Sequence, residues 1–100
     1  MDLLTAFKAL ANPIRLKILS GLKDPERSFP PQDEGDVAVD GVCVSSIQDG
    51  MGLSQSTTSQ YMSVLSKADL VIATRRGKWT YYKRNEVAIR ELAAMIGRDL

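Results

Sequence analysis

The sequence predicts a mainly α-helical domain with one small β-hairpin near its C-terminal end. Apolar residues recur at helical spacing along most of the chain. Residues 70–84 are instead rich in β-branched and aromatic residues, and Gly77 in their middle offers a turn position. A length of 100 residues is typical of one domain, so we expect residues 1–100 to fold as a single unit.

Two helices are predicted before residue 24. The first has apolar residues at helical spacing and ends near Ala11. Asn12 then favours the start of a new helix, and Pro13 suits its first position. This second helix is expected to end near residues 21–23. Its apolar stripe consists of Ile14, Ile18 and Leu22, with Leu19 beside it.

The segment 24–42 differs in kind from the helices around it. It contains six acidic residues and one base, and prolines and glycines interrupt it. We expect an acidic loop inserted into the domain, which is long for a compact fold. Such a loop is either a solvated insertion without a special role or a functional segment. Outside it, twelve bases stand against six acids, so the rest of the chain is basic.

A helix-turn-helix is predicted after the loop. Residues 42–44 can form a very short strand, and Ser45 or Ser46 can cap the helix that follows. Gly52 ends this helix, and Ser54 caps the next one. Helix, glycine turn and helix is the spacing of a helix-turn-helix. In the second of these helices, the residues expected on the buried face are Thr58, Met62, Leu65 and Ala68.

The opposite face of that second helix carries short polar side chains. Ser, Thr and Gln both donate and accept hydrogen bonds, which suits the base edges and phosphates of a DNA major groove. A run so rich in Ser and Thr has poor helix propensity, so we expect its hydroxyls to make contacts. A basic hairpin follows, and a helix followed by a basic hairpin is the layout of a winged-helix DNA-binding protein. The residues expected to contact DNA are Ser54, Gln55, Ser56, Thr57, Ser59, Gln60 and Ser63 of the helix and Arg75, Arg76 and Lys78 of the hairpin.

The last helix is expected to run from Asn85, a favourable cap, to residue 100. Its apolar stripe and that of the first helix together exceed what the core of a small domain can absorb. Pairing these stripes across a two-fold axis is the simplest solution, which predicts a homodimer. The residues expected at the interface are Leu3, Leu4, Phe7, Ile89, Leu92, Ala93 and Ile96.

Several residues have both a structural and a functional interpretation. Cys43 is expected to be a small buried hydrophobe, and a redox-responsive thiol is the alternative. For Arg15 we expect a structural role, such as an ion pair on the helix surface, ahead of a phosphate contact. The aromatic side chains are expected to pack in the core or an interface, with a contact to the sugar-phosphate backbone as the alternative. These aromatic residues are Trp79, Tyr81 and Tyr82.

Composition and motifs argue against other classes of protein. The chain has no His and one Cys, and we can place no nucleophilic dyad or phosphate-binding glycine loop in it. We therefore expect no enzyme activity and no cofactor. The first residues do not resemble a signal peptide, and no apolar run approaches the length of a membrane span. These features predict a cytoplasmic protein without a membrane partner.

Four stretches of the sequence resemble one known family. They are FKALANPIRLKILSGL (7–22), GVCVSSI (41–47), GLSQSTTSQYMSVLSKADLV (52–71) and RRGKWTYYKRN (75–85). In these stretches the chain resembles the ArsR/SmtB family of winged-helix transcriptional repressors, and only residues 24–40 lie outside the likeness. The resemblance implies an α-α-α-α-β-β-α homodimer with its first and last helices at the interface. It also implies repression from an inverted-repeat operator.

The chain departs from the pattern of the metal-sensing members of that family. Those members carry a Cys-x-Cys pair where this chain has Cys43 and Ser45, and others bind zinc through sets that include His, which is absent here. The resemblance therefore implies a regulator that does not respond to metal, with an unknown inducer. Gln60-Tyr61 replaces a His-His pair that is common in the family. Asp69 replaces a Gly, and Asp tolerates the left-handed conformation that this turn needs.

The sequence thus predicts a homodimeric transcriptional repressor that binds double-stranded DNA. Two alternatives stay open. One is a winged-helix module that binds another protein instead of DNA. The other is a regulator that responds to thiol oxidation through Cys43.

Overall fold

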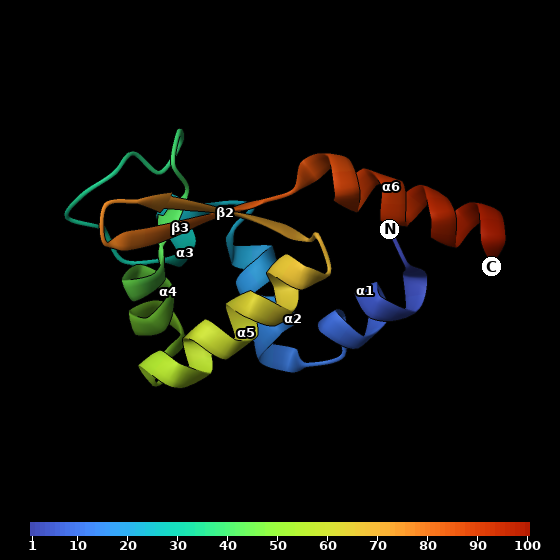
Figure 1. Ribbon diagram of the computed structural model, residues 1–100, viewed down its shortest axis with the longest axis horizontal. Helices are drawn as coiled ribbons and strands as arrows, with labels where there is room; N and C mark the ends of the chain where they lie inside the picture. The colour runs from blue at the N-terminus through green and yellow to red at the C-terminus, as the bar shows by residue number, and fades with distance from the viewer.

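The computed structural model describes residues 1–100 and confirms a mainly helical fold with a small antiparallel sheet (Figure 1). The helices are α1 (Leu3–Leu10), α2 (Pro13–Gly21), α3 (Pro25–Ser28), α4 (Val44–Met51), α5 (Gln55–Lys67) and α6 (Glu86–Asp99). The strands are β1 (Val42–Cys43), β2 (Val71–Arg76) and β3 (Trp79–Arg84), and their order in the sheet is β1-β3-β2. None of the helices has the length and apolar character that crossing a membrane requires.

Local signals place most helix ends where they were predicted. The side chains of Asn12, Ser54 and Asn85 each accept a hydrogen bond from a backbone N–H in the first turn of α2, α5 and α6, respectively, at 2.9 to 3.2 Å. Gly52 ends α4 with a φ of 65°, and Asp69 follows α5 with a φ of 61°. Asp69 therefore takes the left-handed position expected of it in place of glycine.

The start of α4 differs from the prediction. The helix begins at Val44 with Cys43 as its N-cap, and neither Ser45 nor Ser46 caps it. The hydroxyl of Ser45 donates to Cys43 Sγ at 3.3 Å, and Ser46 is buried. Both serines lie inside the first turn of the helix, so the predicted strand over residues 42–44 is one residue shorter and the helix begins earlier.

The acidic segment is also more structured than the predicted loop. Asp24-Pro25 starts the one-turn helix α3, because proline suits the first position of a helix. Phe29, just after α3, is buried in the hydrophobic core. At the end of the segment, β1 pairs with β3, so the sheet has three strands rather than the hairpin alone.

The two faces of the sheet have different neighbours. Residues that oppose each other in an antiparallel pair lie on the same face. One face carries Val42, Val71 and Tyr82, which pack against the helical core. The other face carries Cys43, Thr74, Arg76, Trp79 and Tyr81. Part of the acidic segment lies against this second face.

The core joins α2, α4 and α5 to the start of the hairpin. Its fully buried side chains are Ile18, Ile47, Thr58, Met62, Leu65 and Leu70. Thr58, Met62, Leu65 and Ala68 are all buried, which confirms the predicted inner face of α5. Packing against this core fixes the orientation of α5, although the helix has poor intrinsic propensity.

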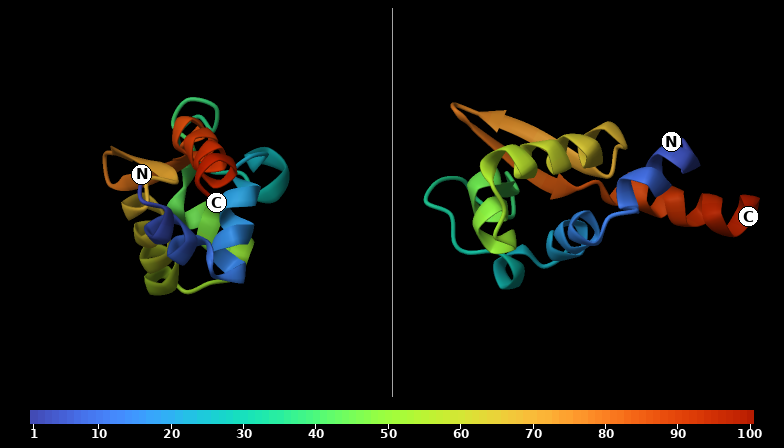
Figure 2. Two further views of the ribbon diagram at one scale, coloured as in Figure 1. Left: turned by 90° about the vertical axis from the view of Figure 1, so that its right-hand side faces the viewer. Right: turned by 90° about the horizontal axis from the view of Figure 1, so that it is seen from below.

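α1 and α6 lie against each other at the end of the molecule opposite the hairpin tip (Figures 1 and 2). Several apolar side chains on these two helices stay exposed in the single chain, among them Leu4 (59%), Phe7 (37%) and Ile96 (39%). Leu92 was predicted at a dimer interface, but it is buried in the core of its own chain together with Ala88. The inner stripe of α6 therefore begins at Ala88, and Ala93 is exposed.

Candidate nucleic-acid interface

The exposed face of α5 consists of hydroxyl and amide side chains. Gln55, Ser56, Ser59, Gln60 and Ser63 are all exposed, and Thr57 is half-buried. They lie opposite the buried residues of the same helix. A face of this kind offers both donors and acceptors without a fixed charge, which suits hydrogen bonding to the edges of base pairs.

Ser54 organises the N-terminal end of this face. Its Oγ accepts from the backbone N–H of Thr57 at 3.2 Å and donates to Thr57 Oγ1 at 2.9 Å. Ser56 Oγ lies 3.4 Å from Ser54 Oγ. On the inner side, Thr58 Oγ1 donates to the Ser54 carbonyl at 2.8 Å. The first turn is thus held by side-chain bonds, and the partial positive charge of a helix N-terminus is exposed beside it.

Arg15 has a structural role, but the predicted ion pair is absent. Its Nε donates to the Ala9 carbonyl at 2.7 Å and its Nη2 donates to the Lys8 carbonyl at 3.2 Å. Its guanidinium carbon lies 5.3 Å from the centre of the Tyr61 ring. Arg15 of α2 therefore satisfies carbonyls at the C-terminal end of α1 and stacks on α5.

The hairpin presents its basic residues around a two-residue turn. Arg76 pairs with Trp79 across the strands, so Gly77 and Lys78 form the turn, and only Gly77 has a positive φ (58°). This is the pattern of a type II′ turn, which requires glycine at its first central position. Arg75 Nε donates to the Gly77 carbonyl at 2.9 Å, and Lys78 Nζ lies 5.4 Å from the centre of the Trp79 ring.

Arg75 and Arg76 point to opposite faces of the hairpin, because successive residues of a strand alternate. Arg75 lies on the face of Thr80, and its Nη1 donates to Thr80 Oγ1 at 3.5 Å. Arg76 lies on the other face, where its Nε is 2.6 Å from Asp40 Oδ1. Asp40 Oδ1 has no hydrogen-bond partner, so its contact with Arg76 is an ion pair.

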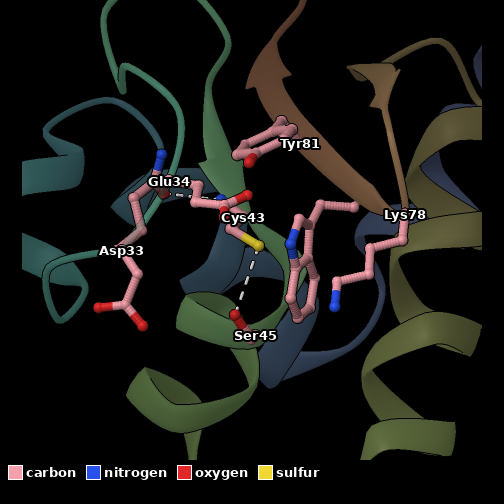
Figure 3. A pocket seen from close by; sticks show the side chains of 8 residues that line it. Asp33, Glu34, Cys43, Ser45, Lys78 and Tyr81 are labelled. Atoms are coloured by element: carbon pink, nitrogen blue, oxygen red, sulfur yellow. Dashed lines mark hydrogen bonds between the residues drawn. The ribbon is translucent and has the colours of Figure 1, made fainter.

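A small cavity of about 160 Å³ lies between the acidic segment, the start of α4 and the hairpin (Figure 3). The residues that line it are Gln32, Asp33, Glu34, Cys43, Ser45, Lys78, Trp79 and Tyr81. Cys43 is buried as predicted, and its sulfur accepts from Ser45. Burial raises the pKa of Tyr81 above its usual value, and the neighbouring Cys43, Glu34 and Asp40 act in the same direction.

The geometry sorts the predicted DNA-contacting residues into two groups. The exposed residues of α5 form one continuous face, and Arg75 and Lys78 lie at the exposed hairpin tip. Arg76 is also exposed, but its side chain is paired with the acidic segment. Such an arrangement suits a helix placed in a groove with a flanking cationic hairpin near the phosphate backbone.

Comparison with known proteins agrees with this arrangement, although no family model matches the chain. A winged helix-turn-helix DNA-binding domain from Mycobacterium bovis is homodimeric and is described as a possible ArsR-family transcriptional regulator. It aligns with a TM-score of 0.63 at 27% identity, over 93% of this chain and 72% of that one. A second relative, from Halobacterium salinarum, is named as the arsenical resistance operon repressor ArsR2. It is 45% identical over 49 residues, which are 49% of this chain and 41% of that protein.

The match that decides the family extends over the full length. The HTH-type transcriptional regulator YbzH of Bacillus subtilis (strain 168) is 47% identical over 100 residues, which are 100% of both chains. This chain belongs to the ArsR family of winged-helix transcriptional regulators. In this ArsR-family regulator, α4 and α5 form the helix-turn-helix and β2–β3 form the wing.

Sequence reasoning missed two residues and one contact that shape the site of this ArsR-family regulator. Asp40 was counted only as one acid of a loop, and Gln32 was not singled out, yet both contact the sheet. The contact of Arg15 with Tyr61 was also missed. These contacts join residues from different elements, so no local pattern marks them.

Proposed function

We propose that the protein is a transcriptional repressor that binds an inverted-repeat operator in double-stranded DNA as a homodimer. The observation that carries this proposal is the division of α5 into a buried apolar face and an exposed face of hydroxyls and amides. The exposed polar residues do not stabilise the core, so contact with a ligand is the best account of them. Gln60 lies near the middle of this face and is the strongest candidate for a base contact.

The exposed apolar residues of α1 and α6 support the homodimer. Leu4, Phe7 and Ile96 remain exposed at the end of the molecule that is farthest from the wing tip. A second copy of the chain that packs on this surface would bury them. It would also place the two α5 helices on one face of the dimer, related by the two-fold axis and about 34 Å apart, as two half-sites separated by one DNA turn require.

The wing is proposed to contact the DNA backbone beside each half-site. Arg75 and Lys78 are exposed at the hairpin tip, and neither forms an ion pair with an acidic residue of the chain. Arginine and lysine at such a tip bind phosphates or insert into the minor groove. These contacts add affinity for every sequence, whereas α5 discriminates among sequences.

The donor chemistry supports a regulator that does not respond to metal. Soft metals need several thiolates, but the neighbour of Cys43 at the α4 N-terminus is the hydroxyl of Ser45. We further propose that the protein acts in the cytoplasm, where its DNA target lies. Its inducer is unknown and is either a signal of another kind or absent.

A binding titration with two variants tests the proposed function. An operator selected from random duplexes would be titrated by fluorescence anisotropy at several salt concentrations. Gln60→Ala should weaken binding to the selected site by about 1–3 kcal/mol and leave random duplex unaffected. Arg75→Ala should weaken binding to all sequences and reduce the salt slope by about one unit.

The control is Arg27→Ala, because Arg27 is an exposed base of α3, away from α5 and the wing tip (Figure 2). It should change neither selectivity nor salt slope. If the wild-type protein bound no duplex even at low salt, the proposed function would be wrong. A winged helix that docks another protein would then be the better account.

A further inference from the structure

We propose that residues 32–40 brace the wing, and that Asp40 holds Arg76 as a positioning residue instead of leaving it free to bind phosphate. We call residues 32–40 the brace segment. This inference rests on the proposed contact between the wing and DNA. It goes beyond that contact because it gives the acidic insertion a role and removes Arg76 from the phosphate-binding set.

The brace segment is attached to the sheet at both of its ends. At its start, Gln32 bonds to β1 and to the residue before it, since its Oε1 accepts from the Cys43 N–H at 2.8 Å and its Nε2 donates to the Gly41 carbonyl at 3.2 Å. At its end, Asp40 lies against Arg76 of β2. The segment is therefore tied to β1 through Gln32 and to β2 through the pair between Asp40 and Arg76.

Between these ends, the backbone of the brace segment packs on an aromatic ring of the wing. Gly35 has a φ of 81°, and a Cβ atom at this position would lie 2.6 Å from Tyr81 Cε1. Tyr81 is only 2% exposed although it stands on the face of the sheet that is turned away from the helical core. The brace segment thus covers the second face of the wing, as Figure 3 shows for Glu34 beside Tyr81.

Asp40 is held in place by hydrogen bonds within the brace segment, independently of Arg76. Its backbone N–H donates to the Asp36 carbonyl at 2.6 Å, and its Oδ2 accepts from the Asp36 N–H at 2.9 Å. Its side chain is 10% exposed, whereas that of Arg76 is 61% exposed. Apart from Arg76, nothing in the chain pairs with Asp40 Oδ1.

This asymmetry decides where Arg76 stays when DNA binds. If Arg76 moved to a phosphate, it would leave the buried Asp40 carboxylate without a cationic partner, which costs more than a solvent-exposed contact returns. Arg75 faces no such cost, because its guanidinium bonds only to the turn carbonyl and to a hydroxyl. The pair between Asp40 and Arg76 therefore persists in the complex and limits the positions that the wing can take.

Trp79 gives a direct readout of the brace. It is the only tryptophan of the chain, and it lines the cavity between the brace segment and the wing. Detachment of the segment would expose its indole to solvent. In Asp40→Asn, Arg76→Gln and Gly35→Ala we expect a red shift of the emission and stronger quenching by acrylamide than in the wild type. Gly35→Ala detaches the segment by a clash and leaves the charge unchanged.

The same variants are titrated with the operator over a range of salt. Each should bind about three- to tenfold more weakly, since a looser wing loses preorganisation, and the salt slope should not change. The double variant Asp40→Asn/Arg76→Gln should bind no more weakly than the weaker single variant. Asp36→Asn is the matched control, because it removes one negative charge from the same segment but keeps the side-chain oxygen that accepts from the Ala38 N–H and the backbone bonds to Asp40, and it should leave Trp79 quenching at the wild-type level.

Three results would overturn the proposal. Unchanged Trp79 quenching in all three variants would mean that the contacts do not hold the segment. Tighter DNA binding by Asp40→Asn than by Asp36→Asn would make the segment a competitor of DNA. A salt slope reduced by about one unit in Arg76→Gln would make Arg76 a phosphate contact. If no variant or wild-type protein bound DNA, the proposed function would fail, but the fluorescence would still report on the brace.

Discussion

The guanidinium of Arg15 lies 5.3 Å from the Tyr61 ring while it donates to the Ala9 carbonyl at 2.7 Å. One side chain of α2 thus connects the end of α1 with the middle of α5. α1 carries part of the proposed dimer interface, and α5 carries the proposed base contacts. The connection therefore helps to fix the orientation of α5 relative to α1.

Replacing Arg15 should destabilise the fold without removing a DNA contact. Arg15→Met keeps the aliphatic stem but loses the two carbonyl bonds and the contact with the ring. We expect the free energy of unfolding to fall by about 1–2 kcal/mol, as measured by urea denaturation. Arg90→Met, which removes an exposed arginine from α6, should change it by less than about 0.5 kcal/mol. Equal effects of the two variants would show that the connection contributes nothing.

Ser54, the N-cap of α5, and Ser56, in its first turn, should differ in their effects on stability and on DNA binding. Ser54→Ala removes the N-cap, so the free energy of unfolding should fall by about 1 kcal/mol. Ser56→Ala should leave stability within about 0.5 kcal/mol of the wild type. It should nevertheless weaken binding to the operator, because its hydroxyl lies on the exposed face of α5 that is proposed to enter the groove. Thermal unfolding and DNA titration of both variants check this separation, which a loss of stability in Ser56→Ala would refute.

Stability should fall at alkaline pH because of two tyrosines. Burial raises the pKa of both Tyr81 and Tyr82 above the usual value of about 10. The contribution of these tyrosines to the free energy of unfolding is fully present below about pH 10, where their side chains are neutral in both the folded and the unfolded chain. It is lost as the pH rises through the folded-state pKa values, because the unfolded chain releases its protons first. Tyr81→Phe should make the urea midpoint less sensitive to pH above 10, whereas an unchanged pH dependence would contradict the assignment.

The proposed interface predicts that one charge on α1 disrupts the homodimer. Phe7→Glu would place a carboxylate on the surface that a second chain should bury, so the protein should become monomeric and lose at least about tenfold in operator affinity. Leu16→Glu is the matched control, since Leu16 is an exposed apolar residue of α2 outside the predicted interface. Size-exclusion chromatography with light scattering measures the outcome, and a Phe7→Glu protein that stays dimeric would exclude this surface.

Short-range signals made much of the fold predictable. Asn12, Ser54, Asn85 and Gly52 mark element boundaries through bonds or dihedral angles within a few residues. The inner face of α5 follows from periodicity alone. The one-residue strand error at Val44 has a local cause, because a serine inside a first helical turn looks like a cap.

The rest depends on contacts between residues far apart in the chain. Asp40 meets Arg76, and Gln32 meets Cys43, only because β1 adds to the sheet beside β3. Nothing in the composition of an acidic loop reveals that it docks on a basic hairpin rather than extending into solvent. Leu92 shows the same limit. The spacing of apolar residues predicts the apolar face of α6, but it does not predict which residues of that face the rest of the same chain buries.

The mass of the protein–DNA complex tests the central account most directly. Sedimentation equilibrium of the wild-type protein with a duplex that carries the selected inverted repeat should give two chains per duplex, with much less complex on a random duplex at the same salt. A single chain that sediments apart from the duplex at micromolar protein would contradict both the dimer and the DNA-binding function.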